Sequence, residues 1–155
     1  MKALAPMEVG FAVADIDAVL PFYRDVLGLK VLSDVTAPAD KSRQTGLAPE
    51  GYRVMRLENE AGDRLKLAQP TLAPLAAAPR AFALERQGGA YATFIVGDID
   101  DLLERFRTAG ADVRSAGKVE VRPGVWVLLV RDPEGNHLEF VQYADLSSYR
   151  PGPKS

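Results

Sequence analysis

An internal repeat constrains the fold of this 155-residue chain more than any other feature. Residues 13–31 read VADIDAVLPFYRDVLGLKV, and residues 96–113 read VGDIDDLLERFRTAGADV, so that Asp15 aligns with Asp98. In each copy an Asp precedes apolar residues at helical spacing, and a Gly follows them before the next apolar run. An Asp in that position caps a helix and a Gly ends one. Each copy is therefore predicted to run strand, helix, strand.

A second match joins the ends of the two copies. Residues 54–69, VMRLENEAGDRLKLAQ, align with residues 127–142, VLLVRDPEGNHLEFVQ. Each segment predicts a hairpin, because two apolar runs flank a polar turn that contains Gly. Strands are expected at 8–14, 29–35, 52–58 and 64–69 in the first copy, and at 91–97, 111–121, 125–131 and 137–143 in the second.

The repeat predicts an α+β fold of two βαβββ modules. We expect the first module over residues 1–70, a Pro- and Ala-rich linker over 71–89, the second module over 90–144 and a C-terminal tail over 145–155. A sheet with one helix needs a second layer for its other face. The modules are therefore expected to pair as curved mixed sheets around a cleft, either within one chain or across a homodimer.

Three segments depart from this regular pattern. Pro21 lies inside the first helical pattern, so the turn from residue 15 to residue 20 is expected to be offset from a helix that runs to residue 27. Residues 36–50 match nothing in the repeat and predict a long loop, which often carries a binding function. Within the linker, a short helix is expected at residues 81–87.

Composition favours a small-molecule partner. The chain has 19 basic and 21 acidic residues and no run of like charges, so no footprint for nucleic acid or an anionic membrane is expected. Because there are no cysteines, disulfides, thiolate metal ligands and a cysteine nucleophile are excluded. The N-terminus lacks the apolar core of a signal peptide, and no stretch approaches the ~20 apolar residues of a membrane span. We expect a soluble cytoplasmic protein.

Three segments resemble a known family: the strand at residues 9–15, FYRDVLG at 22–28 and DPEGNHLE at 132–139. On these segments the chain is similar to the vicinal-oxygen-chelate superfamily, which includes glyoxalase I, methylmalonyl-CoA epimerase, extradiol dioxygenases and the fosfomycin and bleomycin resistance proteins. The similarity extends over about residues 6–143. It implies the paired-module fold with a small-molecule cleft, and it leaves the reaction open because this scaffold supports many chemistries.

The resemblance also implies where a metal would be held. The family takes one ligand from the first strand and one from the last strand of each module, and these positions correspond here to Glu8, Lys66, Tyr91 and Glu139. A charged ammonium group has no lone pair for a cation, and a neutral phenol is a poor ligand. The departures at Lys66 and Tyr91 therefore predict a protein without a metal cofactor, and they disfavour extradiol dioxygenase activity.

Three functions stay open for these four residues. The leading hypothesis is a metal-independent isomerase or lyase that moves a proton next to a carbonyl. Glu139 is its base, Lys66 and Tyr91 stabilise an enolate-like oxygen, and Glu8 and Glu139 hold Lys66. The first rival is a non-catalytic binding protein that sequesters a drug or metabolite. The second rival keeps a divalent metal on Glu8 and Glu139, with His137 as a further ligand. Purely structural roles, an ion pair for Lys66 and a packed ring for Tyr91, are the alternative to all three.

Other residues are candidates for contact with a ligand that carries a carbonyl or carboxylate. His137, the sole histidine, lies two residues before Glu139 and shares its face of the strand, where it could move a proton or pack at the rim. Its repeat partner Arg64 shares a face with Lys66 and could bind a carboxylate or phosphate. Apolar walls could come from Trp126, Phe94 and Met55, although alternation alone does not identify the face on which they lie.

Overall fold

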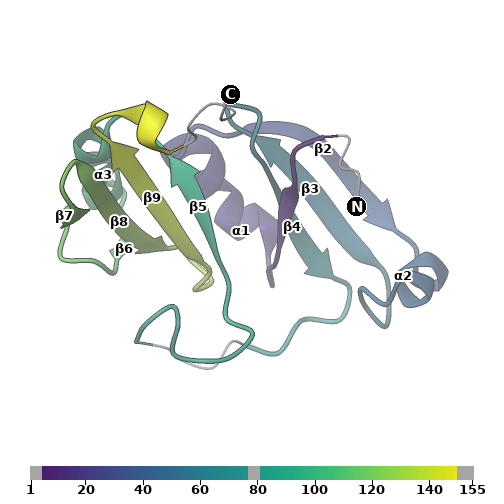
Figure 1. Cartoon of the computed structure of the whole chain (residues 1–155). Coiled ribbons are helices and arrows are strands. Elements are labelled where there is room, and N and C mark those ends of the chain that lie inside the picture. The colour runs from purple at the N-terminus through teal and green to yellow at the C-terminus, as the bar shows by residue number, and fades with distance from the viewer. Residues whose placement is uncertain (1–4, 77–80, 150–155) are drawn as a thin grey trace. The chain divides into compact units, whose positions relative to one another are not determined.

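The structure, a computed structural model, describes residues 5–76 and 81–149. The chain divides into two compact units, Met1–Ala78 and Pro79–Ser155. Each unit contains one mixed sheet and the strand, helix, strand order that the repeat predicts (Figure 1). The expected α+β class with two mixed sheets is confirmed.

The first unit has a four-stranded sheet in the order β1-β4-β3-β2. Its strands are β1 (Glu8–Ala12), β2 (Lys30–Ala37), β3 (Tyr52–Glu58) and β4 (Arg64–Pro70). β1 is parallel to β4, whereas the other neighbours are antiparallel. On one face, alternate apolar residues such as Phe11, Leu57 and Leu67 are buried, as are Ile16 and Val19 of the helix that follows β1. This alternation buries one face of the sheet in the core of the unit.

The first helical segment passes through Pro21 with a change of hydrogen bonding rather than a break. Helix α1 (Ile16–Pro21) is followed directly by a π-helical turn, η1 (Phe22–Val26), in which the Leu27 N–H donates to the Phe22 carbonyl at 3.1 Å. The helical segment therefore ends close to residue 27, as expected, and the change that follows Pro21 is one of helix type. Because proline has no N–H, it cannot complete the regular ladder, and the wider turn continues the helix past it.

The second unit has five strands: β5 (Tyr91–Ile95), β6 (Asp112–Val113), β7 (Val119–Arg122), β8 (Val125–Arg131) and β9 (His137–Tyr143). Their order is β5-β9-β8-β6, and β7 also pairs with β8. Helix α3 (Ile99–Thr108) packs its Phe106 ring 5.3 Å from the Phe140 ring of β9. A short 3-10 helix, η2 (Leu146–Ser148), follows β9.

The strand expected at residues 111–121 is divided into β6 and β7. Between them Gly117 has a φ of 82°, and the Ser115 hydroxyl donates to the Gly117 carbonyl at 2.7 Å. The same hydroxyl accepts from the Leu129 N–H of β8 at 3.1 Å. A side chain thus takes the place of a strand partner at this point, and the local turn interrupts the ladder.

The repeat extends to individual tertiary hydrogen bonds. The Gln69 side-chain oxygen accepts from the Ile16 N–H at the start of α1, at 2.9 Å. Gln142 accepts in the same way from the Ile99 N–H at the start of α3, also at 2.9 Å. The first N–H groups of a helix have no partner within the helix, so each glutamine satisfies one of them from the last strand of its own sheet.

The segments outside the repeat differ from expectation. Residues expected to form a loop at 36–50 include a helix, α2 (Ala39–Thr45), whose buried Ser42 donates to the Ala48 carbonyl at 2.8 Å. Conversely, residues 81–87 form turns instead of the expected short helix, with the Glu85 carboxylate accepting from the Ala81 N–H at 2.7 Å. A single helical turn without an apolar face packed on a core is marginal in water.

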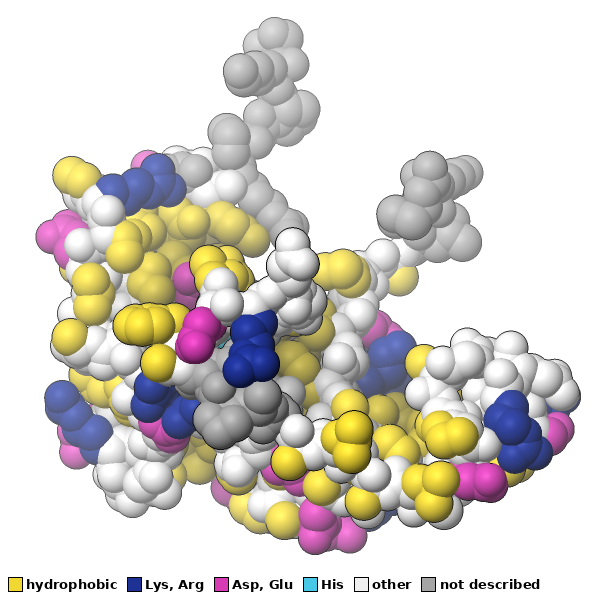
Figure 2. Space-filling view, turned by 90° about the horizontal axis from the view of Figure 1, so that it is seen from below, with side chains coloured by type: hydrophobic (Ala, Val, Ile, Leu, Met, Phe, Trp, Pro, Cys, Tyr) yellow, Lys and Arg dark blue, Asp and Glu magenta, His cyan; other side chains and the backbone are white. Residues whose placement is uncertain are grey.

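The surface carries charges of both signs. Figure 2 shows acidic and basic side chains scattered among hydrophobic ones, with neither sign gathered over that face. In the parts of the chain that the structure describes, no helix is long and apolar enough to cross a membrane.

Candidate functional site

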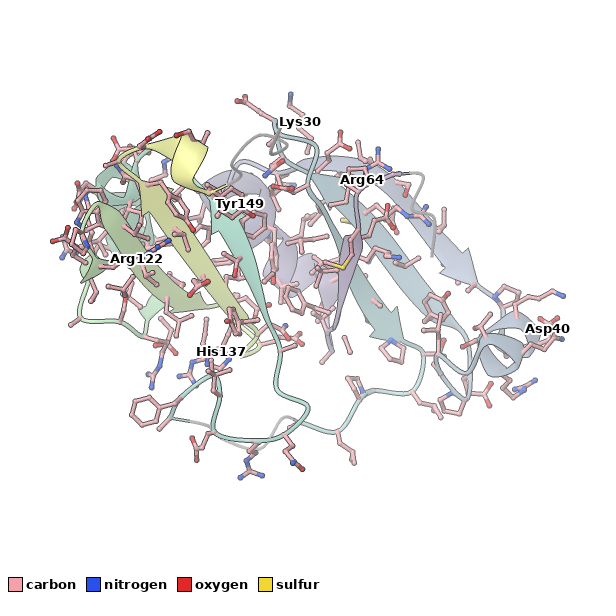
Figure 3. The ribbon with its side chains drawn as sticks, in the orientation of Figure 1. Lys30, Asp40, Arg64, Arg122, His137 and Tyr149 are labelled. Atoms are coloured by element: carbon pink, nitrogen blue, oxygen red, sulfur yellow. The ribbon has the colours of Figure 1, made fainter. Side chains whose placement is uncertain are left out.

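The sheet of the first unit presents a second face, opposite its buried apolar residues. Cross-strand partners on this face are Glu58 with Arg64, Arg56 with Lys66, Val54 with Ala68, and Tyr52 with Pro70. On the other side of β4, Glu8, Gly10 and Ala12 of β1 lie beside Arg64, Lys66 and Ala68. We call this surface the open face of the first unit. Its residues change from charged at the start of β4, where Figure 3 labels Arg64, to apolar at the end.

Glu8 is the centre of an ionic cluster on the open face. Its carboxylate lies 3.0 Å from the Lys66 Nζ, 3.6 Å from an Arg64 nitrogen and 3.8 Å from the Arg56 Nε. Arg64 in turn forms a 2.6 Å contact with Glu58. The hydrogen bond from Lys66 lowers the pKa of Glu8 below its usual value of 4.5, against an opposing effect of burial and with help from the charges of Lys66 and Arg56. Glu8 is therefore ionised at neutral pH and is a weak base.

Two hollows meet at the Glu8–Lys66 pair. One has a volume of about 610 Å³ and is lined by Glu58 and Arg64 among others. The second, about 370 Å³, runs along the open face from Arg56 to Tyr52, and Leu47 from the loop after α2 closes part of it. A volume of this size is in the range of small-molecule sites. The described open face of the first unit thus holds a pocket with a charged end and an apolar end.

The second unit places Tyr91 and Glu139 on one face of its sheet. Tyr91 of β5 is opposite His137 of β9, and Thr93 is opposite Glu139. The Thr93 hydroxyl donates to the Glu139 carboxylate at 2.7 Å. Tyr91 is 42% exposed, whereas His137 is 1% exposed. The Tyr91 phenol therefore reaches solvent and the Glu139 carboxylate is held by a hydroxyl, whereas the imidazole of His137, which Figure 3 labels, is buried at the start of β9.

The three proposed apolar wall residues lie on the opposite faces. Met55 and Phe94 are buried, Met55 next to Leu57 along β3 and Phe94 stacked on Phe140, 5.6 Å between ring centroids. Trp126 is the partner of Gln142, the residue that caps α3. All three belong to the helix-covered side of their sheets, so we exclude them from the candidate site. The alternation of apolar residues alone does not say which face of a sheet is buried. The buried face is the one that the helices cover.

The structure adds residues that the sequence patterns did not single out. Arg56 lies opposite Lys66 across the predicted hairpin, and Thr93 lies opposite Glu139 across β5 and β9. The register of the hairpin would have found Arg56, because residues at equal distances from the turn face each other. No sequence pattern pointed to Leu47, because it belongs to the segment at residues 36–50 that has no counterpart in the second module.

Lys66 lies at one of the family's metal positions, and its charged ammonium group has no lone pair for a cation. In the first unit the Lys66 ammonium contacts Glu8 and lowers its pKa, so the cationic partner of this carboxylate is already part of the chain. Among the described residues, no group of three or more His, Cys, Asp and Glu side chains gathers in a way that could hold a metal ion. The donor set fits an internal ion pair better than a metal centre.

Comparison with known families identifies the class of protein. The model of the Glyoxalase/Bleomycin resistance protein/Dioxygenase superfamily matches residues 7–140. The chain therefore belongs to this superfamily, and the resemblance found in the sequence is confirmed. A search of curated proteins finds no match.

Solved structures support the same fold. A glyoxalase family protein from Bacillus cereus has a TM-score of 0.74 at 22% identity, with 94% of this chain and 97% of that chain covered. A glyoxylase/bleomycin resistance protein/dioxygenase domain from Frankia sp. has a TM-score of 0.70 at 20% identity, covering 97% and 96%. Glyoxalase I from Leishmania major has a TM-score of 0.62 at 21% identity, covering 87% and 84%. At these identities the likeness concerns the fold alone.

Proposed function

We propose that this protein is a metal-independent member of the superfamily that binds a small carbonyl or carboxylate compound at Lys66 and moves a proton next to its carbonyl, as an isomerase or lyase does. The observation that carries the proposal is the 3.0 Å contact between Lys66 and Glu8 in the wall of a pocket. An ammonium group at this place supplies the positive charge that relatives with a metal obtain from the ion.

Lys66 has three N–H donors, and the contact with Glu8 orients the group without using all of them. Charge that develops on a carbonyl oxygen during removal of a neighbouring proton would be stabilised by the remaining donors. The sequence predicts Glu139 as a base and Tyr91 as a donor, and these roles in the second unit stay part of the prediction. Two features support these roles: the Thr93 hydroxyl orients the Glu139 carboxylate at 2.7 Å, and the Tyr91 side chain is 42% exposed.

Non-catalytic binding is the second candidate, and one observation favours it. The lowered pKa of Glu8 makes the carboxylate in the first pocket a poor proton acceptor. A pocket whose Glu8 carboxylate is held in an ion pair with Lys66 would bind a ligand without removing a proton from it. Recovery of chemically unaltered ligand, with no exchange of its protons, would favour this candidate over the enzyme.

Proton exchange tests the catalytic proposal directly. A panel of small α-oxo and β-oxo acids would be incubated with the protein in deuterated water, with loss of the proton next to the carbonyl followed by nuclear magnetic resonance. We expect exchange with the wild type and a decrease of at least about 100-fold with Lys66→Ala, the size of effect that one electrostatic donor produces. Lys30→Ala removes an exposed lysine that does not line either pocket and is the matched control. Equal exchange by the wild type and Lys66→Ala would rule the scheme out.

A further inference from the structure

The open face of the first unit is polar at one end and apolar at the other, and this gradient follows the strands. Along β3 the residues that point into the 370 Å³ pocket are Arg56, then Val54, then Tyr52. Arg56 is four positions along the strand from Tyr52, a distance of about 13 Å at the ordinary rise of a strand. A ligand that fills the pocket is therefore elongated, with chemically different ends.

Charge is not balanced at the polar end. The cluster contains the carboxylates of Glu8 and Glu58 and the cations of Arg56, Arg64 and Lys66, which leaves one positive charge in excess. Arg64 is held by Glu58 at 2.6 Å and Lys66 by Glu8 at 3.0 Å, but the contact of Arg56 with Glu8 is 3.8 Å, longer than a hydrogen bond. Arg56 is thus the cation that is most loosely held.

The middle of the pocket is open because its floor has small side chains. Gly10 and Ala12 lie on β1 beside Lys66 and Ala68 of β4, and a Cβ placed on Gly10 would meet only the Lys66 Cβ, at an ordinary contact distance of 3.9 Å. At the far end, Tyr52 and Pro70 are cross-strand partners and Leu47 comes from the loop after α2. The hydrogen bond from buried Ser42 to the Ala48 carbonyl, 2.8 Å, holds that loop in place.

We propose that the ligand class is an aromatic or similarly flat oxo acid, whose carboxylate is bound by Arg56 and whose apolar body lies over Gly10, Ala12 and Ala68 toward Tyr52. Arginine suits this role because its planar fork of donors matches a carboxylate. This inference rests on the proposed function, since it places the carbonyl next to the carboxylate and hence within the reach of Lys66. It adds that Arg56 selects for the negative charge and that Gly10 makes room for the ring.

Three probes separate the parts of this inference. Phenylpyruvate has the carboxylate, the carbonyl and the ring, phenylacetone lacks the carboxylate, and pyruvate lacks the ring. Calorimetric titration of the full-length protein should show phenylpyruvate binding about tenfold or more tightly than either of the others. Failure of phenylpyruvate to bind the wild type at millimolar concentration would overturn the inference, while the proposed function would remain testable with carbonyl compounds of other shapes.

Variants assign each part to a residue. Arg56→Gln should weaken phenylpyruvate binding by about 10- to 100-fold and phenylacetone binding by less than about twofold, because only the former carries the charge. Arg24→Gln, which makes the same change of charge at an arginine hydrogen-bonded to its neighbour Asp25, should change neither. Arg56→Lys keeps the charge without the planar fork of donors and should give intermediate affinity, which excludes misfolding as the cause.

Gly10→Val tests the apolar part of the pocket. It should weaken binding of both aromatic probes and leave binding of pyruvate unchanged.

The outcomes also distinguish this inference from the proposed function. If Lys66→Ala abolishes binding while Arg56→Gln leaves the preference for phenylpyruvate over phenylacetone intact, Arg56 is not the anion site and the role of Lys66 stands. If Arg56→Gln removes that preference while Lys66→Ala affects neither affinity nor proton exchange, the anion site stands and the proposed role of Lys66 is wrong.

Discussion

At the scale of single residues, the contact between Lys66 and Glu8 affects stability as well as chemistry. The pKa of Glu8 is lowered in the folded protein, chiefly by its hydrogen bond with Lys66. A carboxyl group with a lowered pKa stabilises the fold at pH values above its unfolded pKa, near 4.5, and this contribution is lost as the pH falls through the folded value. The ion pair is partly exposed, so its contribution is about 1 kcal/mol or less.

Replacing Glu8 should reveal how this contribution to stability depends on pH. Glu8→Gln is expected to lower the free energy of unfolding by up to about 1 kcal/mol at neutral pH, because Lys66, Arg56 and Arg64 then lose a counter-charge. The difference between wild type and variant should shrink as the pH is lowered from neutral through the folded pKa of Glu8, because the wild-type carboxyl is then protonated too. Urea unfolding at neutral and at acid pH measures it. A difference that is the same at both would show that the ion pair does not contribute.

At the scale of elements, the same hydrogen bond is made at the start of α1 and of α3. Gln69 and Gln142, the aligned residues of the repeat, each accept from the first N–H of the helix in their own unit. In each unit a glutamine side chain therefore joins the last strand to the start of the helix, in addition to the apolar packing between them. The sequence revealed the pairing of the two glutamines, but not their partners, because the distance along the chain to each helix is large.

Loss of this acceptor should destabilise the protein. Gln69→Leu leaves the N–H of the buried Ile16 without its partner, so we expect the free energy of unfolding to fall by about 1–3 kcal/mol. Gln69→Glu keeps an acceptor and places a negative charge at a helix start, so it should restore most of the loss. Gln44→Leu, at an exposed position of α2, is the control. Equal stability of Gln69→Leu and Gln44→Leu in denaturant titrations would contradict this role.

The sequence pattern predicted some elements closely and missed others. The hairpins at residues 52–70 and 125–143 were predicted within a residue, because turn residues and alternation act locally. Helix α2 and the break between β6 and β7 were not, since both depend on side-chain hydrogen bonds made by Ser42 and Ser115. At the site, the family positions led to Glu8 and Lys66, but the choice of sheet face for Met55, Phe94 and Trp126 needed the helices to be placed.

At the scale of the whole molecule, β2 is suited to a contact with another copy of the chain. It lies at one end of its sheet order, and Val31, Leu32 and Val35 are 43%, 45% and 49% exposed. An edge strand with large apolar side chains tends to pair with another chain. We therefore predict a homodimer, with Leu32→Lys shifting it toward monomer. Light scattering after size exclusion would check this, and a mass of 16.8 kDa for the wild type at every concentration would contradict it.

Under the function proposed above, Lys66 supplies the positive charge that metal-dependent members of the superfamily obtain from an ion. The most direct test is the metal content of the full-length protein purified without chelators, measured by mass spectrometry of the elements. We expect far less than one equivalent of any divalent metal, because the ammonium of Lys66 already occupies Glu8 at 3.0 Å. One equivalent of bound metal that is lost on Glu139→Ala would contradict the account.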